Sequence, residues 1–258
     1  MSARPILLGT GWKMNKTVRE ATDYTRSLLT HLDTIPGLER AQLFVVPPFT
    51  AIDAVKRASE GRFWVGAQNM HWAKDGAFTG EISAPMLREL GTDLVELGHA
   101  ERRTYFNETD ETINRKVRTA LEFEIRPLVC VGENREERES GAGPDVVARR
   151  LRLALEGTPS RLADRLMLAY EPLWAIGAPV AAGPDDVRVM AAHIRSVLAD
   201  MFGAAGESIP ILYGGTVNVE NAAGLLREGR TNGLFIGRAA WQPEGFAGVI
   251  RACLGASS

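Results

Sequence analysis

Residues 6–15 of the chain read Ile-Leu-Leu-Gly-Thr-Gly-Trp-Lys-Met-Asn. The stretch starts as a short apolar run, which is typical of a strand that is covered on both faces. It then passes through glycines into polar side chains. An open, doubly wound α/β sheet usually carries a glycine-rich phosphate-binding turn directly after its first strand. Because Gly-Thr-Gly-Trp-Lys-Met-Asn does not match the spacing of that turn, the stretch argues against the open sheet.

The rest of the chain repeats this unit, a short apolar run followed by a longer amphipathic segment. The apolar runs predict strands at 6–9, 42–46, 62–66, 93–97, 127–131, 166–170, 209–213 and 233–236. The amphipathic segments predict helices at 18–32, 50–58, 110–122, 146–156, 184–201, 219–228 and 243–254. Such alternation is typical of βα units around a parallel sheet, and eight units fit the size of a closed (β/α)8, or TIM, barrel. We therefore predict a single α/β barrel domain over residues 1–258.

Two of the predicted helices begin with capping signals. The hydroxyl of Thr50 can accept an otherwise orphan backbone N–H at the start of the helix at 50–58. The helix at 184–201 starts with Pro-Asp-Asp. Proline fits the first helical turn, and acidic side chains are favoured at the positive end of the helix dipole.

The composition excludes several classes of protein. The 258 residues are 45% hydrophobic and 24% charged, which is ordinary for a soluble globular protein. The 30 basic and 32 acidic side chains give a net charge of −2, so nothing favours a nucleic-acid partner or an anionic membrane surface. We expect no targeting segment and no membrane span, which would need roughly 18 apolar residues in a row. The two cysteines, Cys130 and Cys253, fit a reducing, cytoplasmic location.

In a barrel of this kind, chemistry is carried by the loops that follow the strands, and three titratable residues stand there. Lys13 can neutralise a phosphate or a negative charge that develops on oxygen. His99 can move protons or, when neutral, polarise a carbonyl. Glu171 can act as a general base if it is partly desolvated. Each residue also has a plain structural interpretation, as a surface lysine, a packed histidine or a rim carboxylate in a salt bridge.

The segments after the last three strands predict a lid and a phosphate site. Residues 172–176, Pro-Leu-Trp-Ala-Ile, would be unusual on an exposed loop, so we expect them to fold down and exclude water. Glycines follow the seventh strand at 214–215 and the eighth at Gly237. They let backbone N–H groups approach an anion, and a helix N-terminus would add a favourable dipole. No spacing of His, Cys or Asp along the chain indicates a metal site.

Taken together, these segments resemble the triosephosphate isomerase family along the whole chain. The motifs that carry the resemblance stand in the family's order: 12–15 (Trp-Lys-Met-Asn), 76–81 (Gly-Ala-Phe-Thr-Gly-Glu), 96–103 (Glu-Leu-Gly-His-Ala-Glu-Arg-Arg), 170–177 (Tyr-Glu-Pro-Leu-Trp-Ala-Ile-Gly) and 213–217 (Tyr-Gly-Gly-Thr-Val). The resemblance implies a sugar-phosphate isomerase that needs no cofactor and no metal.

The resemblance also implies a role for each site residue. By the family's well-known acid–base chemistry, Glu171 would be the base and neutral His99 the electrophile that polarises the reacting oxygens. Lys13, supported by Glu101, would stabilise the charge of the enediolate and of the phosphate. The implied substrate-binding residues are Gly11, Glu101, Gly177, Thr216, Gly237 and Arg238. Thr79 would reach toward the neighbouring site in a homodimer.

The sequence departs from the family pattern at four places. Gly11 stands where the family has an asparagine, and Ala100 stands where it has a serine. The lid tip at 177–183 reads Gly-Ala-Pro-Val-Ala-Ala-Gly, so the effect of Ala178, Pro179 and Val180 stays open. Arg238 replaces a glycine and either pairs with a phosphate or lid carboxylate or simply points outward.

The first two departures leave room at the end of the site that is away from the phosphate. The segments 66–73 and 233–241 are similar to the L-erythrulose 1-phosphate isomerase branch of the family, which serves erythritol and threitol catabolism. We therefore favour the conversion of L-erythrulose 1-phosphate to D-erythrulose 4-phosphate through an enediolate. The alternatives are the glycolytic conversion of dihydroxyacetone phosphate, a non-catalytic phosphate-binding barrel, and an aldolase in which Lys13 forms a Schiff base.

Three further residues keep structural interpretations. Cys130 lies within a predicted strand, where a buried thiol serves packing. Arg102 and Arg103 follow His99 and are predicted to form salt bridges at the barrel rim.

Overall fold

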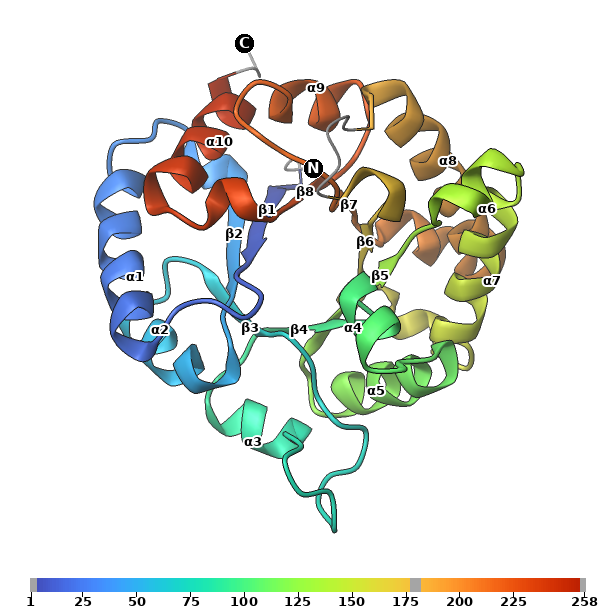
Figure 1. Cartoon of the computed structure of the whole chain (residues 1–258), viewed down its shortest axis with the longest axis horizontal. Helices are drawn as coiled ribbons and strands as arrows, with labels where there is room; N and C mark the ends of the chain where they lie inside the picture. The colour runs from blue at the N-terminus through green and yellow to red at the C-terminus, as the bar shows by residue number, and fades with distance from the viewer. Residues whose placement is uncertain (1–3, 177–181, 256–258) are drawn as a thin grey trace.

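A computed structural model of the chain describes residues 4–176 and 182–255. In this part of the chain, eight parallel strands pair in sequence order and the last pairs with the first, so that the sheet closes into a barrel (Figure 1). The strands are β1 (Ile6–Gly11), β2 (Ala41–Val46), β3 (Trp64–Ala67), β4 (Leu94–Leu97), β5 (Arg126–Val131), β6 (Met167–Tyr170), β7 (Ile211–Tyr213) and β8 (Gly233–Ile236). The predicted barrel is therefore confirmed, with strand ends that move by one to two residues.

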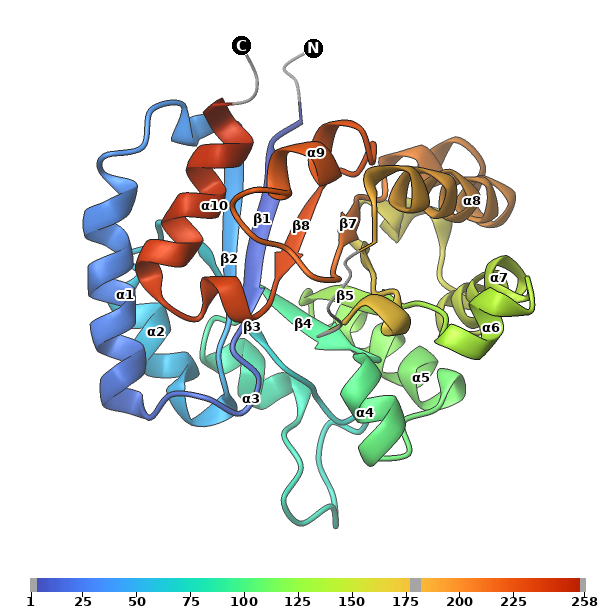
Figure 2. The same cartoon turned by 45° about the horizontal axis from the view of Figure 1, so that its top comes forward.

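Helices surround the barrel on its outside, as Figures 1 and 2 show from two directions. They are α1 (Val18–Leu32), α2 (Ile52–Ala58), α3 (Ala84–Glu89), α4 (Ala100–Tyr105), α5 (Asp110–Glu122), α6 (Arg135–Glu139), α7 (Gly143–Leu155), α8 (Pro184–Phe202), α9 (Ala222–Arg227) and α10 (Pro243–Gly255). Short 3-10 turns lie at Leu38–Arg40, Phe49–Ala51, Ser160–Arg165, Leu173–Ala175, Gly203–Ser208 and Arg238–Ala240.

Several local predictions were wrong. The capping role of Thr50 is one, because this residue lies inside the 3-10 turn Phe49–Ala51, and α2 begins after Ala51 without a side-chain cap. The helix predicted from 219 begins only at Ala222, because Asn218 and Asn221 bond each other's backbone N–H through their side chains. Helices α3, α4 and α6 were not predicted, since five or six residues are too few to show a helical period.

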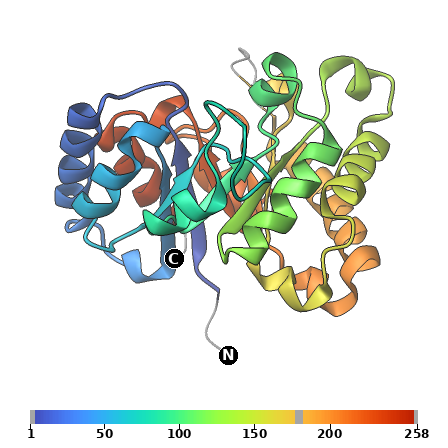
Figure 3. The ribbon, with the colours of Figure 1, turned by 90° about the horizontal axis from the view of Figure 1, so that it is seen from below.

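Apolar side chains form two layers, one inside the barrel and one between the strands and the helices. The inner layer contains Phe44, Leu128, Met167 and Phe235, and also Cys130, whose predicted packing role is confirmed by its complete burial. Figure 3 shows the barrel from the side, with the blue β1 rising from the N-terminal end. Within the described residues, no helix is long and apolar enough to cross a membrane.

Candidate active site

The structure brings the three predicted catalytic side chains and Glu101 to the same end of the barrel, after β1, β4 and β6. The ammonium Nζ of Lys13 lies 2.6 Å from Oε1 of Glu101. The other oxygen of Glu101 lies 3.8 Å from Nδ1 of His99. On the far side of the same ring, Nε2 lies 3.7 Å from Oε1 of Glu171. Residues that are up to 158 positions apart in the sequence therefore form one chain of charged and titratable groups.

Lys13 occupies a constrained backbone position at the start of this chain. Its φ is +54°, in the left-handed region that residues with side chains rarely adopt. The amide of Gln68 holds the turn, because its Nε2 donates to the carbonyl oxygens of Lys13, at 2.8 Å, and Val46, at 3.1 Å. Sequence reasoning placed Gln68 in a family segment but gave it no part in holding the lysine.

The hydrogen bonds of His99 specify its tautomer. The residue precedes α4, and its Nδ1 accepts the backbone N–H of Glu101 at 3.1 Å. A ring nitrogen that accepts carries no proton, so this geometry belongs to a neutral imidazole with its proton on Nε2, toward Glu171. Burial lowers the pKa of His99, but the carboxylates of Glu171, Glu96 and Glu101 together raise it above its usual value.

Glu171 is placed by close backbone approaches. Its side chain is 3% exposed, and the N–H of Ala100 donates to Oε2 at 3.4 Å. A Cβ at Gly214 would lie 2.9 Å from its Cγ, and one at Gly132 would lie 1.8 Å from its carbonyl oxygen. Gly214 therefore makes room for the side chain of Glu171, and Gly132 makes room for its backbone. The carboxylate faces His99 where little water reaches it.

A fourth titratable side chain, Glu96, joins the cluster from the end of β4. It is 6% exposed, and burial, reinforced by the charge of Glu171, raises its pKa to about 7 against the opposing effects of His99 and Lys13. Oxygens of Glu96 and Glu171 and a ring nitrogen of His99 all lie within 4.8 Å of one another. This grouping was missed because Glu171 lies far along the chain from Glu96 and His99, so no metal-ligand spacing shows.

Gly11 lies beside Glu96. Its carbonyl oxygen accepts the indole N–H of Trp241 at 3.1 Å. A Cβ on Gly11 would lie 3.0 Å from the ring of Phe235 and 3.7 Å from Oε2 of Glu96. A side chain at this position would therefore meet an aromatic ring on one side and a carboxyl group on the other.

The family model of triosephosphate isomerase matches residues 6–253 of the chain. The chain belongs to the triosephosphate isomerase family. It is 48% identical to the L-erythrulose-1-phosphate isomerase of Mesorhizobium japonicum, over 94% of this chain and 95% of that one. It is 43% identical to the triosephosphate isomerase of Alkaliphilus oremlandii, over 96% and 98%. The crystal structure of triosephosphate isomerase from Bartonella henselae superposes with a TM-score of 0.86 at 32% identity, covering 97% of this chain and 99% of that one.

As a member of the triosephosphate isomerase family, the chain is an isomerase. A buried acid holds the segment that follows Glu171. There Glu133, which is 1% exposed, anchors the 3-10 turn Leu173–Ala175. One of its carboxylate oxygens accepts the hydroxyl of Tyr170 at 2.9 Å and the indole N–H of Trp174 at 2.7 Å. The apolar segment packs down as expected, with Ala175 buried. Gly177 and the lid-tip residues Ala178, Pro179 and Val180 lie outside the described residues.

Glu133→Gln should loosen this anchor and lower kcat/KM about tenfold, because a neutral amide accepts these two hydrogen bonds less strongly than a carboxylate. Steady-state kinetics would measure the loss. Glu136→Gln, an exposed position in neighbouring α6, serves as the matched control and should leave kcat/KM unchanged. Equal activity in the two variants would contradict a part for Glu133 in the lid.

The predicted phosphate residues lie after β7 and β8. The hydroxyl of Thr216 donates to the carbonyl oxygen of Ala175 at 2.7 Å, which joins the phosphate turn to the lid anchor. Because α9 starts at Ala222, the expected helix dipole stands farther from this turn than predicted. Arg238 is exposed and makes no hydrogen bond or ion pair within residues 4–176 and 182–255, and its pairing with a phosphate or a lid carboxylate stays a prediction.

The two arginines after His99 confirm the predicted rim salt bridges. Arg102 lies 3.6 Å from Glu108, and Arg103 lies 2.6 Å from Asp110. Arg103 also donates to the carbonyl oxygen of Gly98 at 2.8 Å. Both arginines therefore brace the loop that carries the histidine.

The loop with Thr79 projects from the barrel between β3 and α3, as Figures 1 and 2 show. Thr79 is exposed, and Phe78 beside it is 45% exposed. A second apolar side chain, Met14, is 95% exposed next to Lys13. The loop thus presents apolar surface on the same strand-end side as the catalytic cluster.

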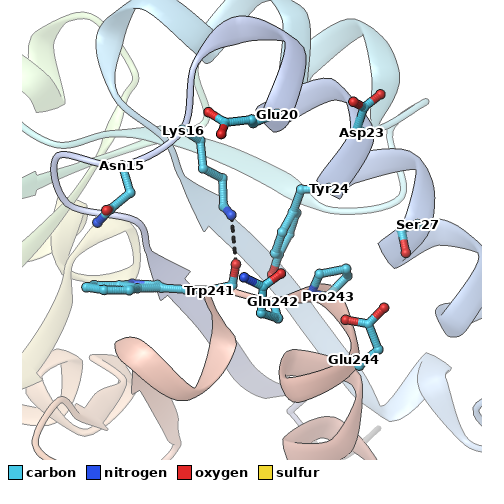
Figure 4. A pocket seen from close by; sticks show the side chains of 10 residues that line it. All are labelled: Asn15, Lys16, Glu20, Asp23, Tyr24, Ser27, Trp241, Gln242, Pro243 and Glu244. Atoms are coloured by element: carbon cyan, nitrogen blue, oxygen red, sulfur yellow. Dashed lines mark hydrogen bonds between the residues drawn. The ribbon is translucent and has the colours of Figure 1, made fainter.

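A separate surface pocket lies between α1 and the start of α10 (Figure 4). Lys16 points into it, donates to the carbonyl oxygen of Trp241 at 2.7 Å and stands 4.7 Å from the ring of Tyr24. The acidic side chains of Glu20 and Glu244 lie on its rim. The pocket contains none of the catalytic residues that the family implies, and its lysine is already engaged.

Proposed function

We propose that the chain converts L-erythrulose 1-phosphate into D-erythrulose 4-phosphate. The observation that carries the proposal is the pairing of the Nε2 side of His99 with buried Glu171 at 3.7 Å, beside a position 11 that has no side chain. The pairing fits proton transfer between adjacent carbons. The glycine fits a substrate with one carbon more than a triose phosphate.

In the proposed reaction, the carboxylate of Glu171 removes the proton from C3, and the electrons of the broken C–H bond form the C2–C3 double bond of an enediolate. Nε2 of neutral His99 gives its proton to the oxygen on C2, and the deprotonated ring nitrogen then takes the proton from the oxygen on C3. Glu171 returns its proton to C2, and the carbonyl forms at C3. The ammonium of Lys13 stabilises the negative charge on oxygen during these steps.

The polar and charged groups around the site support one orientation of the bound substrate. The phosphate would lie against the backbone after β7 and β8, where Thr216 and Gly237 stand, and Gly177, which lies outside the described residues, is proposed as a further phosphate contact. Lys13 would neutralise part of its charge. The far end of the substrate would then lie beside Gly11 and Ala100, which carry less side chain than the asparagine and serine of the family pattern. We further propose a cytoplasmic homodimer of single-domain subunits in which the loop with Thr79 completes the partner's site.

The glycolytic substrate is the second candidate, favoured by the 43% identity to a triosephosphate isomerase. One extra methylene in a pocket is worth only about 1–3 kcal/mol of discrimination, so activity on both substrates is expected. A non-catalytic phosphate-binding barrel would instead bind a phosphate analogue and turn over neither compound.

A kinetic comparison of L-erythrulose 1-phosphate with dihydroxyacetone phosphate, on one preparation, tests the substrate. We expect kcat/KM for the tetrulose phosphate to be about tenfold higher or more. A value for dihydroxyacetone phosphate that is equal or higher would overturn the proposed substrate while leaving the family reaction in place.

A further inference from the structure

Glu96 is a buried acid that the proposed mechanism does not use. Its side chain belongs to β4 and is 6% exposed. Within residues 4–176 and 182–255, the only hydrogen bond to its carboxyl group comes from the thiol of Cys130, whose Sγ lies 4.0 Å from Oε1. A thiol is a weak donor, and Oε2 receives no hydrogen bond from the same residues, so this oxygen can take a further partner.

The carboxyl group of Glu96 is aimed at the reacting pair. One of its oxygens lies within 4.8 Å of both the carboxylate of Glu171 and a ring nitrogen of His99. Oε2 also lies 3.7 Å from the place that a Cβ on Gly11 would occupy. A further partner for Oε2 would therefore approach from the side of the reacting pair and Gly11, where the proposed substrate has its extra carbon.

The chemistry around Glu96 selects the kind of partner. The groups that act on it electrostatically are His99, Glu171, Lys13 and Glu101. With two carboxylates nearby, an anionic phosphate is disfavoured here, and a neutral hydroxyl group is acceptable. Because the pKa of Glu96 is raised to about 7, both of its forms exist near neutral pH. The ionised form accepts a hydrogen bond from a hydroxyl group, and the protonated form can also donate one.

We propose that Glu96 is a specificity-determining residue whose carboxyl group hydrogen-bonds the terminal hydroxyl of the carbon that a tetrulose phosphate has and a triose phosphate lacks. This inference rests on the proposed function, because it names the group that recognises the larger substrate.

The test compares the ratio of kcat/KM for L-erythrulose 1-phosphate to that for dihydroxyacetone phosphate in wild type, Glu96→Leu, Glu96→Met and Glu96→Gln. We expect the ratio to fall about 10- to 100-fold in the two apolar variants, because the hydrogen bond is lost. The ratio should fall less in the Gln variant, since an amide can still form a hydrogen bond with a hydroxyl group. Replacing a buried carboxyl group whose one donor is a thiol by an apolar side chain should not impair folding, and two apolar variants guard against a packing failure.

The matched control is Leu128→Met. Leu128 is the register partner of Glu96 on β5, and the substitution keeps the volume of the inner layer, so the substrate ratio should not change. The inference is overturned if the Glu96 variants lose activity on both substrates in parallel, or if their ratio of kcat/KM values stays within about twofold of wild type. Glu96 then does not recognise the terminal hydroxyl of the tetrulose phosphate. Wild-type protein that fails to turn over the tetrulose phosphate would overturn the proposed substrate, and this inference with it.

Discussion

Glu171→Gln should lower kcat about 10³-fold on either sugar phosphate. The amide has almost the shape of the carboxylate, so it can occupy the same space against Gly214 and the N–H of Ala100. It cannot, however, take a proton from carbon. The loss should therefore appear in kcat, with KM nearly unchanged, because the carboxylate acts on the reacting carbon and not on the phosphate.

The control for this variant is Glu89→Gln, a change of the same type at an exposed position of α3. It should keep wild-type kcat. Thermal unfolding of both variants would show whether the barrel is intact. Full activity in Glu171→Gln, in a folded protein, would remove Glu171 from the role of base.

His99→Gln should lower kcat by about 10²- to 10³-fold, the usual effect of losing one donor to a developing oxyanion. In the structure, the Nδ1 atom of His99 accepts the N–H of Glu101, which leaves Nε2–H free to donate toward the substrate beside Glu171. Glutamine offers an N–H of a different reach and cannot carry a proton from one substrate oxygen to the other.

The matched control for His99→Gln is His31→Gln, on the outer helix α1 and far from the strand ends. Kinetics on one substrate at a fixed pH suffice for the comparison. A loss confined to KM would mean that His99 only binds the substrate, and a loss smaller than about threefold would remove it from the chemistry.

The fold and the main chemical groups could be predicted because their signals are local. Each strand is a short apolar run, and Lys13, His99 and Glu171 directly follow such runs, so the barrel's geometry brings them together. The short helices α4 and α6 carry no period that a sequence reading can detect. The cap expected at Thr50 failed because the 3-10 turn before α2 occupies that position.

The contacts that support these groups could not be predicted, because they join side chains that are distant in sequence. The side chain of Gln68 donates to the backbone of Lys13. The carboxylate of Glu133 accepts hydrogen bonds from Tyr170 on the next strand and from Trp174 in the turn that follows it. Glu96 was part of a recognised motif, but only the structure shows that it is buried, that its one hydrogen-bond donor among the described residues is the thiol of Cys130, and that it faces Gly11. Such relations depend on the register of the strands.

Exchange of hydrogen with solvent tests the central claim most directly, because the proposed reaction moves one carbon-bound proton through Glu171. Wild-type protein incubated with L-erythrulose 1-phosphate in deuterated water should introduce deuterium at the reacting carbons, as NMR or mass spectrometry would detect, and Glu171→Gln should abolish the incorporation. Wild-type protein that binds the sugar phosphate but introduces no deuterium, or a Gln variant that exchanges at the wild-type rate, would contradict the account.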